Sequence, residues 1–183
     1  MARKPQARER LLDAFDRIVV DEGERSATLD AVAARAGVSK GGLLYHFSTR
    51  QDLADASVER MQRLSEEGTQ AMEASAEGPA RAYLRSSLWA DTPLDRSILT
   101  TSRLVQSGDQ GAREAMLSLE ARWYGMLEAE LGDPVAAQAV LHMGDGLYQN
   151  AALGILADRA QDREAVMEQL LEALERLRPS ASS

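Results

Sequence analysis

The chain has 183 residues, no cysteine and a formal net charge of −8 at pH 7. The lack of cysteine excludes disulfide bonds and thiolate metal sites. Hydrophobic residues make up 44 % of the chain, which is enough for a core, but no run of about 18 apolar residues predicts a membrane span.

The first ten residues are basic, with Arg3, Lys4, Arg8 and Arg10 against Glu9 alone. We expect residues 1–6 to form a mobile basic arm, although a frayed charged terminus fits equally well. No apolar run of the signal-peptide type follows, so we expect a cytoplasmic protein. Pro5 suits the first turn of a helix that ends near Glu22, before Gly23. Its apolar residues form one stripe: Leu11, Leu12, Phe15, Ile18 and Val19.

Residues 28–47 predict two short helices joined by a tight turn. Thr28 can cap the first helix, and Gly37 is the residue type expected just after its end. Ser39 can cap the second helix, on which Leu43 and Phe47 lie four residues apart as inward anchors. This arrangement is typical of a helix-turn-helix, whose second helix enters the major groove of DNA. By itself, however, the helix pair fits an ordinary hairpin inside a helical core equally well.

The second of these helices has an unusual composition. Lys40, Tyr45 and His46 can donate hydrogen bonds to phosphates or base edges. Gly41 and Gly42 would let the backbone come close to a duplex, although each costs a helix about 1 kcal/mol relative to alanine. A requirement other than helix stability is therefore expected to have placed them there.

The segment AARAGVSKGGLLYHF at residues 33–47, followed by STRQDL, resembles the DNA-binding region of the tetracycline-repressor (TetR) family. The resemblance extends over residues 8–55 and departs at Leu44, where the family often has tyrosine. It implies phosphate contacts from Thr28, Ser39, Tyr45, His46 and Arg50, with Arg50 at the family's basic position. It also implies base-edge or groove contacts from Lys40, Gly41 and Gly42, and a lysine suits guanine O6 and N7.

The remainder of the chain predicts further helices, so the expected fold is all-α with about nine helices. Glycine and proline separate the predicted segments. These segments are residues 49–76, 79–90, 94–106, 111–131, 134–157 and 161–177. We expect a helix-turn-helix DNA-binding domain over residues 1–52 and a regulatory and dimerisation domain over 53–183, with a linking helix at 58–76.

Two copies of a helix-turn-helix are needed to read both halves of a palindromic operator, so we expect a homodimer. The resemblance places its interface in residues 134–177. Small residues and a leucine seam there would permit close packing: Ala136, Ala137, Ala139, Gly144, Gly146, Ala151, Ala152, Gly154, Leu170, Leu174 and Leu177. The alternative is that both helices only close the core of one subunit.

The resemblance also implies a small, largely apolar effector bound among the middle helices. Aromatic and methionine side chains with a few polar tips suit such a ligand. The candidates are Trp89, Arg103, Met116, Trp123, Tyr124, Met126, His142, Met143 and Tyr148. Ordinary core packing explains many of the same residues. His142, Asp145 and Gln149 could share one helical face, as part of a site or of an interface.

The leading hypothesis is thus a ligand-responsive DNA-binding regulator, most often a repressor in this family. An all-helical scaffold that does not bind DNA is the alternative. We expect no enzyme and no cofactor, because the chain has two histidines and no glycine-rich phosphate loop or His-Glu-x-x-His motif. The net charge is unevenly distributed along the chain. Residues 1–60 have no net charge, and residues 61–183 carry the entire net charge of −8.

Overall fold

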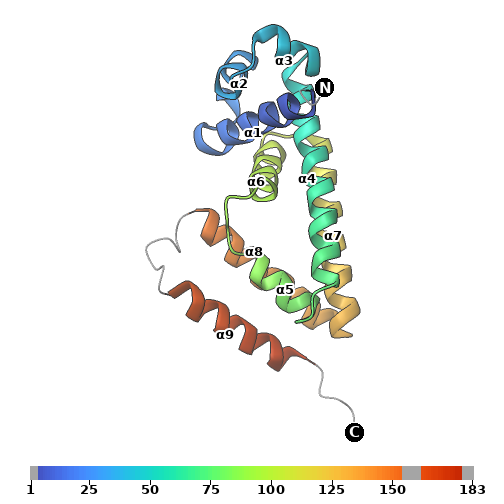
Figure 1. Ribbon diagram of the computed structural model, residues 1–183. Helices are drawn as coiled ribbons and strands as arrows, with labels where there is room; N and C mark the ends of the chain where they lie inside the picture. Colours follow the sequence, from blue (N-terminus) through green and yellow to red (C-terminus); the bar gives the residue numbers. More distant parts are fainter. Residues whose placement is uncertain (1–3, 154–161, 179–183) are drawn as a thin grey trace. The chain divides into compact units, whose positions relative to one another are not determined.

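The computed structural model describes residues 4–153 and 162–178. These residues form nine α-helices, one short 3-10 helix and no β-strand, which confirms the all-α prediction (Figure 1). The elements are α1 (Lys4–Glu22), η1 (Glu24–Ser26), α2 (Leu29–Ala36), α3 (Lys40–His46), α4 (Arg50–Glu73), α5 (Pro79–Ser86), α6 (Pro93–Gln106), α7 (Gln110–Leu131), α8 (Pro134–Ala152) and α9 (Asp162–Leu177).

Local chemistry sets most helix ends where the sequence predicted them. Three predicted ends differ, and η1 was not predicted. α4 ends at Glu73 instead of residue 76. α5 ends at Ser86 instead of residue 90, because the hydroxyls of Ser86 and Ser87 both donate to the carbonyl of Tyr83 and favour a turn there. α8 has its C-cap at Leu153, and the rest of the predicted 134–157 helix, with Gly154, lies outside the described residues. Positions 1–3 of the predicted basic arm also lie outside them, and the prediction is wrong for residues 4–6, which belong to α1.

The chain divides into two compact units. The first unit takes residues 1–65 and 91–118, and the second takes residues 66–90 and 119–183. The division proposed from the sequence, at residue 52, concerns function and stays a prediction. None of the described helices combines the length and the apolar character that a membrane span needs.

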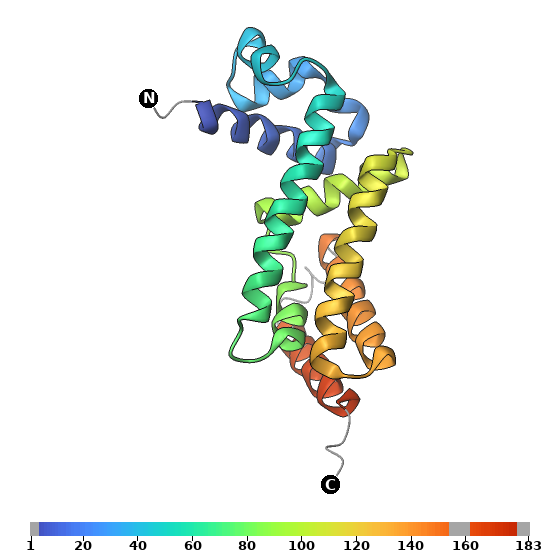
Figure 2. The ribbon, with the colours of Figure 1, turned by 90° about the vertical axis from the view of Figure 1, so that its right-hand side faces the viewer.

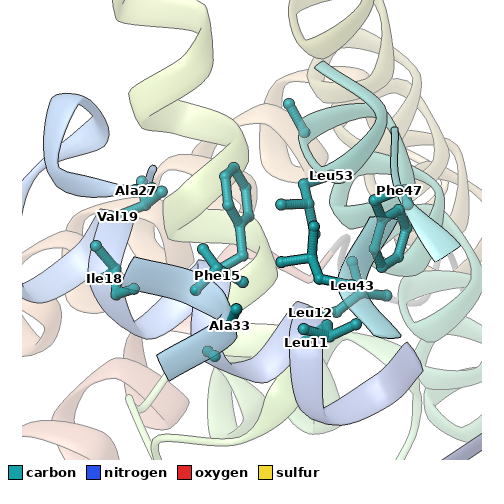
Figure 3. Packing of buried hydrophobic residues seen from close by; sticks show 14 of the residues in the cluster. Leu11, Leu12, Phe15, Ile18, Val19, Ala27, Ala33, Leu43, Phe47 and Leu53 are labelled. Atoms are coloured by element: carbon teal, nitrogen blue, oxygen red, sulfur yellow. The ribbon is translucent and has the colours of Figure 1, made fainter. Parts of the chain in front are cut away.

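The first unit is built around the apolar stripe of α1. Leu11, Leu12, Phe15 and Val19 have no exposed surface, as the spacing predicted. Figure 3 shows these side chains packed with residues from the later helices, namely Ala33, Leu43, Phe47 and Leu53. Burying each large apolar side chain contributes about 1.5–3 kcal/mol, so this cluster holds α2 and α3 on α1.

Helices from far along the chain complete the same core. Leu104 of α6 and Ala112 of α7 are buried in the cluster, and Val105 packs against it. α6 also lies against α1. The helix-turn-helix is therefore supported by residues more than 50 positions away in the sequence.

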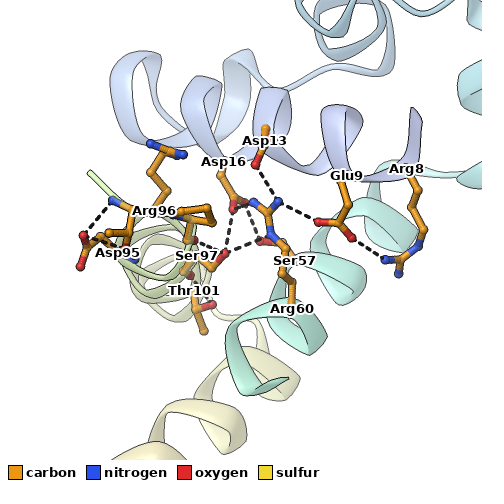
Figure 4. A network of polar contacts seen from close by, with 12 residues as sticks. Arg8, Glu9, Asp13, Asp16, Ser57, Arg60, Asp95, Arg96, Ser97 and Thr101 are labelled. Atoms are coloured by element: carbon orange, nitrogen blue, oxygen red, sulfur yellow. Dashed lines mark hydrogen bonds and ion pairs between the residues drawn. The ribbon is translucent and has the colours of Figure 1, made fainter. Parts of the chain in front are cut away.

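A buried polar network also joins α1, α4 and α6 (Figure 4). Arg60 of α4 lies at its centre and forms an ion pair with Asp16 of α1. The Arg60 guanidinium also donates to Asp13 at 2.8 Å, and the Ser97 hydroxyl of α6 donates to Asp16 at 3.0 Å. These contacts fix α4 and α6 to the first helix by directional bonds as well as by apolar packing.

The second unit packs α5 against both α8 and α9 (Figure 2). Tyr83, Leu84, Leu141 and Leu174 are buried in its core. Gly144 of α8 lies directly against the ring of Tyr83, where a β-carbon would overlap the ring. A glycine is therefore required for α5 and α8 to come this close.

Candidate DNA-binding surface

The turn between α2 and α3 is fixed by its own sequence. The Thr28 hydroxyl accepts from the Ala31 N–H at 3.2 Å, and the Ser39 hydroxyl accepts from the Gly42 N–H at 3.1 Å. Both predicted N-caps are confirmed. Gly37 has φ 62°, a left-handed conformation that favours glycine, and closes α2. The result is a rigid helix-turn-helix over residues 29–46.

α3 has one inward face and one outward face. Leu43 and Phe47 point into the core of the first unit and are almost fully buried. Lys40, Gly41 and Tyr45 are exposed on the other side, and the Tyr45 side chain is 68 % exposed. Three of the predicted DNA contacts therefore share a surface that the core leaves free.

The two glycines of α3 have different surroundings. A β-carbon on Gly42 would lie 2.9 Å from Val38 Cγ1 and 3.2 Å from Ser39 Oγ. A β-carbon on Gly41 would meet nothing within 4 Å. The fold itself therefore accounts for Gly42, whereas Gly41 has no neighbour in the first unit that demands a glycine.

The remaining polar candidates on the helix-turn-helix have weak or shared partners. Lys40 Nζ lies 2.8 Å from Asp30 Oδ1, but both side chains are mostly exposed, at 62 % and 73 %. Such surface pairs contribute about 0–1 kcal/mol, so a phosphate or base can compete for the lysine. His46 is half-buried, with its ring next to those of Tyr45 and Phe47.

Arg50 contacts the protein itself, while 36 % of its side-chain surface stays exposed. Its guanidinium donates to the backbone carbonyls of Glu24 at 2.9 Å and Ala27 at 3.2 Å, and to the Glu24 carboxylate at 2.6 Å. These contacts tie the first turn of α4 to the η1 loop that precedes α2. The sequence pattern predicted a phosphate contact for Arg50 and gave no sign of this structural role. The phosphate contact stays a prediction.

The distribution of charge between the two units favours the first unit, which holds the helix-turn-helix, for contact with DNA. The first unit holds 14 basic and 14 acidic residues, whereas the second holds seven basic and 15 acidic residues. The second unit thus carries the entire net charge of −8, and the helix-turn-helix does not share it. Because affinity for phosphates depends on local charge, the acidic total does not argue against DNA binding.

The nine candidate effector residues do not all fall in one unit. Arg103 and Met116 belong to the first unit, and the other seven belong to the second. In the second unit, the rings of Trp89 and Tyr148 lie 5.9 Å apart. Met126 is buried in the core, which is the ordinary packing role.

The other candidates in the second unit lie nearer its surface. Met143 packs against the same core as Met126 and is half-buried. Tyr124 bonds to Glu128 through its hydroxyl at 3.2 Å. His142 is exposed beside Gln138.

Tyr83 was not predicted as a polar site from the sequence, and it lies next to Trp123, one of the nine effector candidates. The Tyr83 hydroxyl lies within hydrogen-bond distance of the Leu141 carbonyl (3.1 Å) and the Asp145 carboxylate (3.3 Å). Burial and the nearby Asp145 raise the pKa of this hydroxyl far above its usual range. The Trp123 ring packs on Tyr83, and its buried indole N–H has no acceptor among the described residues.

The fold and this exposed recognition helix define a helix-turn-helix regulator, and comparison with known proteins gives its family. Residues 11–57 match the model of the bacterial regulatory proteins of the tetR family. Residues 77–175, more than half of the chain, match the tetracyclin repressor-like C-terminal domain. The chain belongs to the tetR family of bacterial regulatory proteins, which confirms the resemblance found in the sequence.

Curated relatives match only a part of the chain. An HTH-type transcriptional regulator of Pseudomonas putida, SrpR, is 38 % identical over 61 residues, covering 31 % of this chain and 29 % of SrpR. The uncharacterised HTH-type transcriptional regulator TtgW, also from Pseudomonas putida, is 38 % identical over 61 residues, or 31 % of this chain and 46 % of TtgW. The match therefore spans less than half of either relative.

Solved structures match the chain over nearly its whole length. The multidrug binding protein EbrR, complexed with malachite green, is 25 % identical with a TM-score of 0.66, covering 94 % of this chain and 98 % of that one. Two further structures share the fold. A TetR-family member from Streptomyces coelicolor A3 is 24 % identical with a TM-score of 0.69, covering 95 % of this chain and 99 % of that one. The SmeT–triclosan complex is 20 % identical with a TM-score of 0.67, covering 91 % of this chain and 90 % of that one.

Proposed function

We propose that this protein is a DNA-binding transcriptional regulator that binds a near-palindromic operator as a homodimer. The observation that carries the proposal is the outward face of α3, where Lys40, Gly41 and Tyr45 are exposed on a helix whose other face is locked into the core. A helix held in this way can enter a major groove without losing its support.

The proposed contacts fall into two groups. Lys40, Gly41 and Gly42 contact base edges or let the backbone approach them, and Lys40 suits guanine. Phosphate contacts come from Thr28, Ser39, Tyr45, His46 and Arg50. The capping hydroxyls of Thr28 and Ser39 act as acceptors within the fold, so their hydrogens remain able to donate to phosphate oxygens.

We propose that α8 and α9 form the dimer interface. Val135 of α8 is 77 % exposed, and Leu170 and Leu177 of α9 are half-buried, so apolar surface remains for a partner. The small residues of α8 divide between the two expected roles: Ala136, Ala137, Gly144 and Ala151 are buried within the subunit, and Gly146 is exposed. On α9, Leu174 is also buried.

The dimer is tested by light scattering over a range of protein concentrations. The unmodified protein is expected to have twice the subunit mass. Leu170→Asp is expected to shift the mass toward one subunit, while Leu117→Asp, at an exposed leucine of α7, leaves it unchanged. A monomeric wild-type protein would contradict the proposal.

A small, largely apolar effector is proposed for the second unit. EbrR and SmeT, two proteins of the same fold, are complexed with malachite green and triclosan. Here the buried Trp123 N–H next to Tyr83 has no acceptor among the described residues, so it offers a donor for one polar atom of such a ligand. Binding would release DNA only if the ligand favours a conformation that cannot span both half-sites.

Selection of bound fragments from random or genomic DNA tests the DNA-binding function. The expected result is a near-palindrome with half-sites about 34 Å, or a multiple of that, apart. Lys40→Ala should lower the preference for the selected site over random DNA, whereas Arg113→Ala, an exposed arginine of α7, should not. Salt-sensitive binding without sequence preference, or no binding, would contradict the proposal.

A further inference from the structure

An exposed leucine on the recognition helix lies outside the buried core of the first unit. Leu44 is 42 % exposed, while its neighbour Leu43 and the later Phe47 supply the inward contacts of α3. Only five large hydrophobic side chains among the described residues are exposed, and Leu44 and Tyr45 are two of them, side by side on a seven-residue helix. The polar hydroxyl of Tyr45 suits a solvent-exposed position, whereas the side chain of Leu44 has no polar group.

The position of Leu44 on α3 places it on the proposed groove face. It follows Lys40 by four residues and Gly41 by three, so all three lie on neighbouring positions of the helix surface. Gly41 has no side chain, and the space where its β-carbon would stand is open. Leu44 is therefore adjacent to the Lys40 ammonium donor and to the exposed backbone of Gly41 on the surface of α3.

The chemistry of Leu44 restricts what it can recognise. Its side chain has no hydrogen-bond donor or acceptor, so it cannot hold a phosphate or a polar base edge. In the major groove, the thymine C5-methyl is the apolar feature that distinguishes one base pair from the others. We propose that Leu44 is a specificity-determining residue that contacts a thymine methyl in each half-site, beside the base contacted by Lys40. This inference rests on the proposed DNA-binding function.

The test uses the operator obtained by selection and the full-length protein. Each thymine of one half-site is replaced in turn by deoxyuridine, which keeps base pairing and removes only the methyl group. At one position the wild-type protein should bind about fourfold more weakly, the loss expected when one buried methyl is removed, and about 15-fold more weakly when both half-sites are changed.

The variant Leu44→Ala tests whether the effect of the thymine methyl depends on the leucine side chain. Leu44→Ala should bind the natural operator more weakly and should no longer distinguish thymine from uracil at that position. Leu117→Ala, at a leucine of α7 that is 48 % exposed, should keep the full difference. Thermal unfolding of both variants should match the wild type, because neither side chain is part of the buried core.

The outcomes separate this inference from the function on which it rests. If the wild-type protein shows no sequence-preferring binding, the proposed function fails, and the role of Leu44 fails with it. If it binds a selected operator, but no uracil substitution weakens binding or the effect persists undiminished in Leu44→Ala, the thymine contact alone is overturned. A selected operator without a thymine in either half-site overturns it as well.

Discussion

Arg60 of α4 and Asp16 of α1 form an ion pair that is closed off from solvent, with 2 % and 0 % of their side-chain surface exposed. Burial raises the pKa of the Asp16 carboxyl, while the Arg60 guanidinium and the hydroxyls of Ser57 and Ser97 act in the opposite direction. The charge of Arg60 is thus balanced inside the protein. The pair attaches α4 to the helix that carries the helix-turn-helix, and Ser97 adds α6 to the same attachment.

The first prediction concerns this pair. Arg60→Met should lower the free energy of unfolding by about 3–5 kcal/mol, because it leaves the buried Asp16 without its partner. The double variant Asp16→Leu/Arg60→Met should recover most of the loss. Urea unfolding measures both, with Arg17→Met, at an exposed arginine of α1, as the control. Equal losses in the single and double variants would show that the pairing is not the cause.

A second prediction follows from the hydrogen bonds that Arg50 donates to the η1 segment and to Ala27. Arg50→Ala should destabilise the protein by about 1–3 kcal/mol, because the carbonyls of Glu24 and Ala27 lose their charged donor. Arg50→Lys should not restore stability, since lysine lacks the planar fork that reaches several acceptors. Exposed Arg25, mutated to alanine, is the control in urea unfolding. Unchanged stability together with weaker binding to all DNA would identify Arg50 as a phosphate contact only.

The third prediction compares two glycines of the second unit, Gly144 of α8 and Gly125 of α7. Gly144→Ala should destabilise the second unit by about 1–3 kcal/mol, because the new β-carbon overlaps the ring of Tyr83. A β-carbon on Gly125 would meet no described atom within 4 Å, so Gly125→Ala should raise stability by up to about 1 kcal/mol through helix propensity. Thermal unfolding of the two variants at one protein concentration measures the difference. Equal effects at both sites would mean that α5 and α8 do not pack this closely.

The glycines of α3 give a fourth prediction. Gly41→Ala should raise the free energy of unfolding by up to about 1 kcal/mol but weaken operator binding, because open space in the protein becomes a clash with the duplex. Gly42→Ala should bring no gain in stability, since its β-carbon would press on Val38. Urea unfolding and a gel-shift titration measure the two properties. Full DNA affinity in Gly41→Ala would contradict the close approach proposed here.

The fifth prediction is a dependence of stability on pH. The Ala112 N–H and the Gln51 amide hold the pKa of Asp109 below its ordinary value of 3.8. The unfolded chain therefore binds this proton more strongly, so the contribution of Asp109 is complete above about pH 5 and is lost as the pH falls through the folded-state pKa.

Asp109→Asn tests this linkage. It should cost about 0.3–1 kcal/mol at neutral pH, where the charge favours the N-terminus of α7, and progressively less in acid. Urea unfolding at a series of pH values measures the difference from the wild type. Glu114→Gln, at an exposed carboxyl of the same helix, is the control. A difference that stays constant across the series would mean that the carboxylate charge has no part in the effect.

The sequence by itself determined the helices and the recognition turn. Thr28 caps α2 and Ser39 caps α3, each by accepting a hydrogen bond from the backbone N–H three residues later. Gly37 is favoured because its own φ is positive. The apolar stripe of α1 likewise follows from spacing within one helix. These features depend on neighbours along the chain, so the pattern of residue types is enough to predict them.

Only the tertiary structure decided where the charged and small residues point. Arg50 finds its acceptors 23 and 26 residues earlier, and Asp16 meets Ser97 across 81 residues. An arginine in a family's basic position looks the same in a sequence whether it faces DNA or a loop. Gly41 and Gly42 are likewise the same residue type in the sequence and differ only in the atoms that surround them in the fold. Which partner a side chain meets is set by packing between distant segments, and that information exists only once the chain has folded.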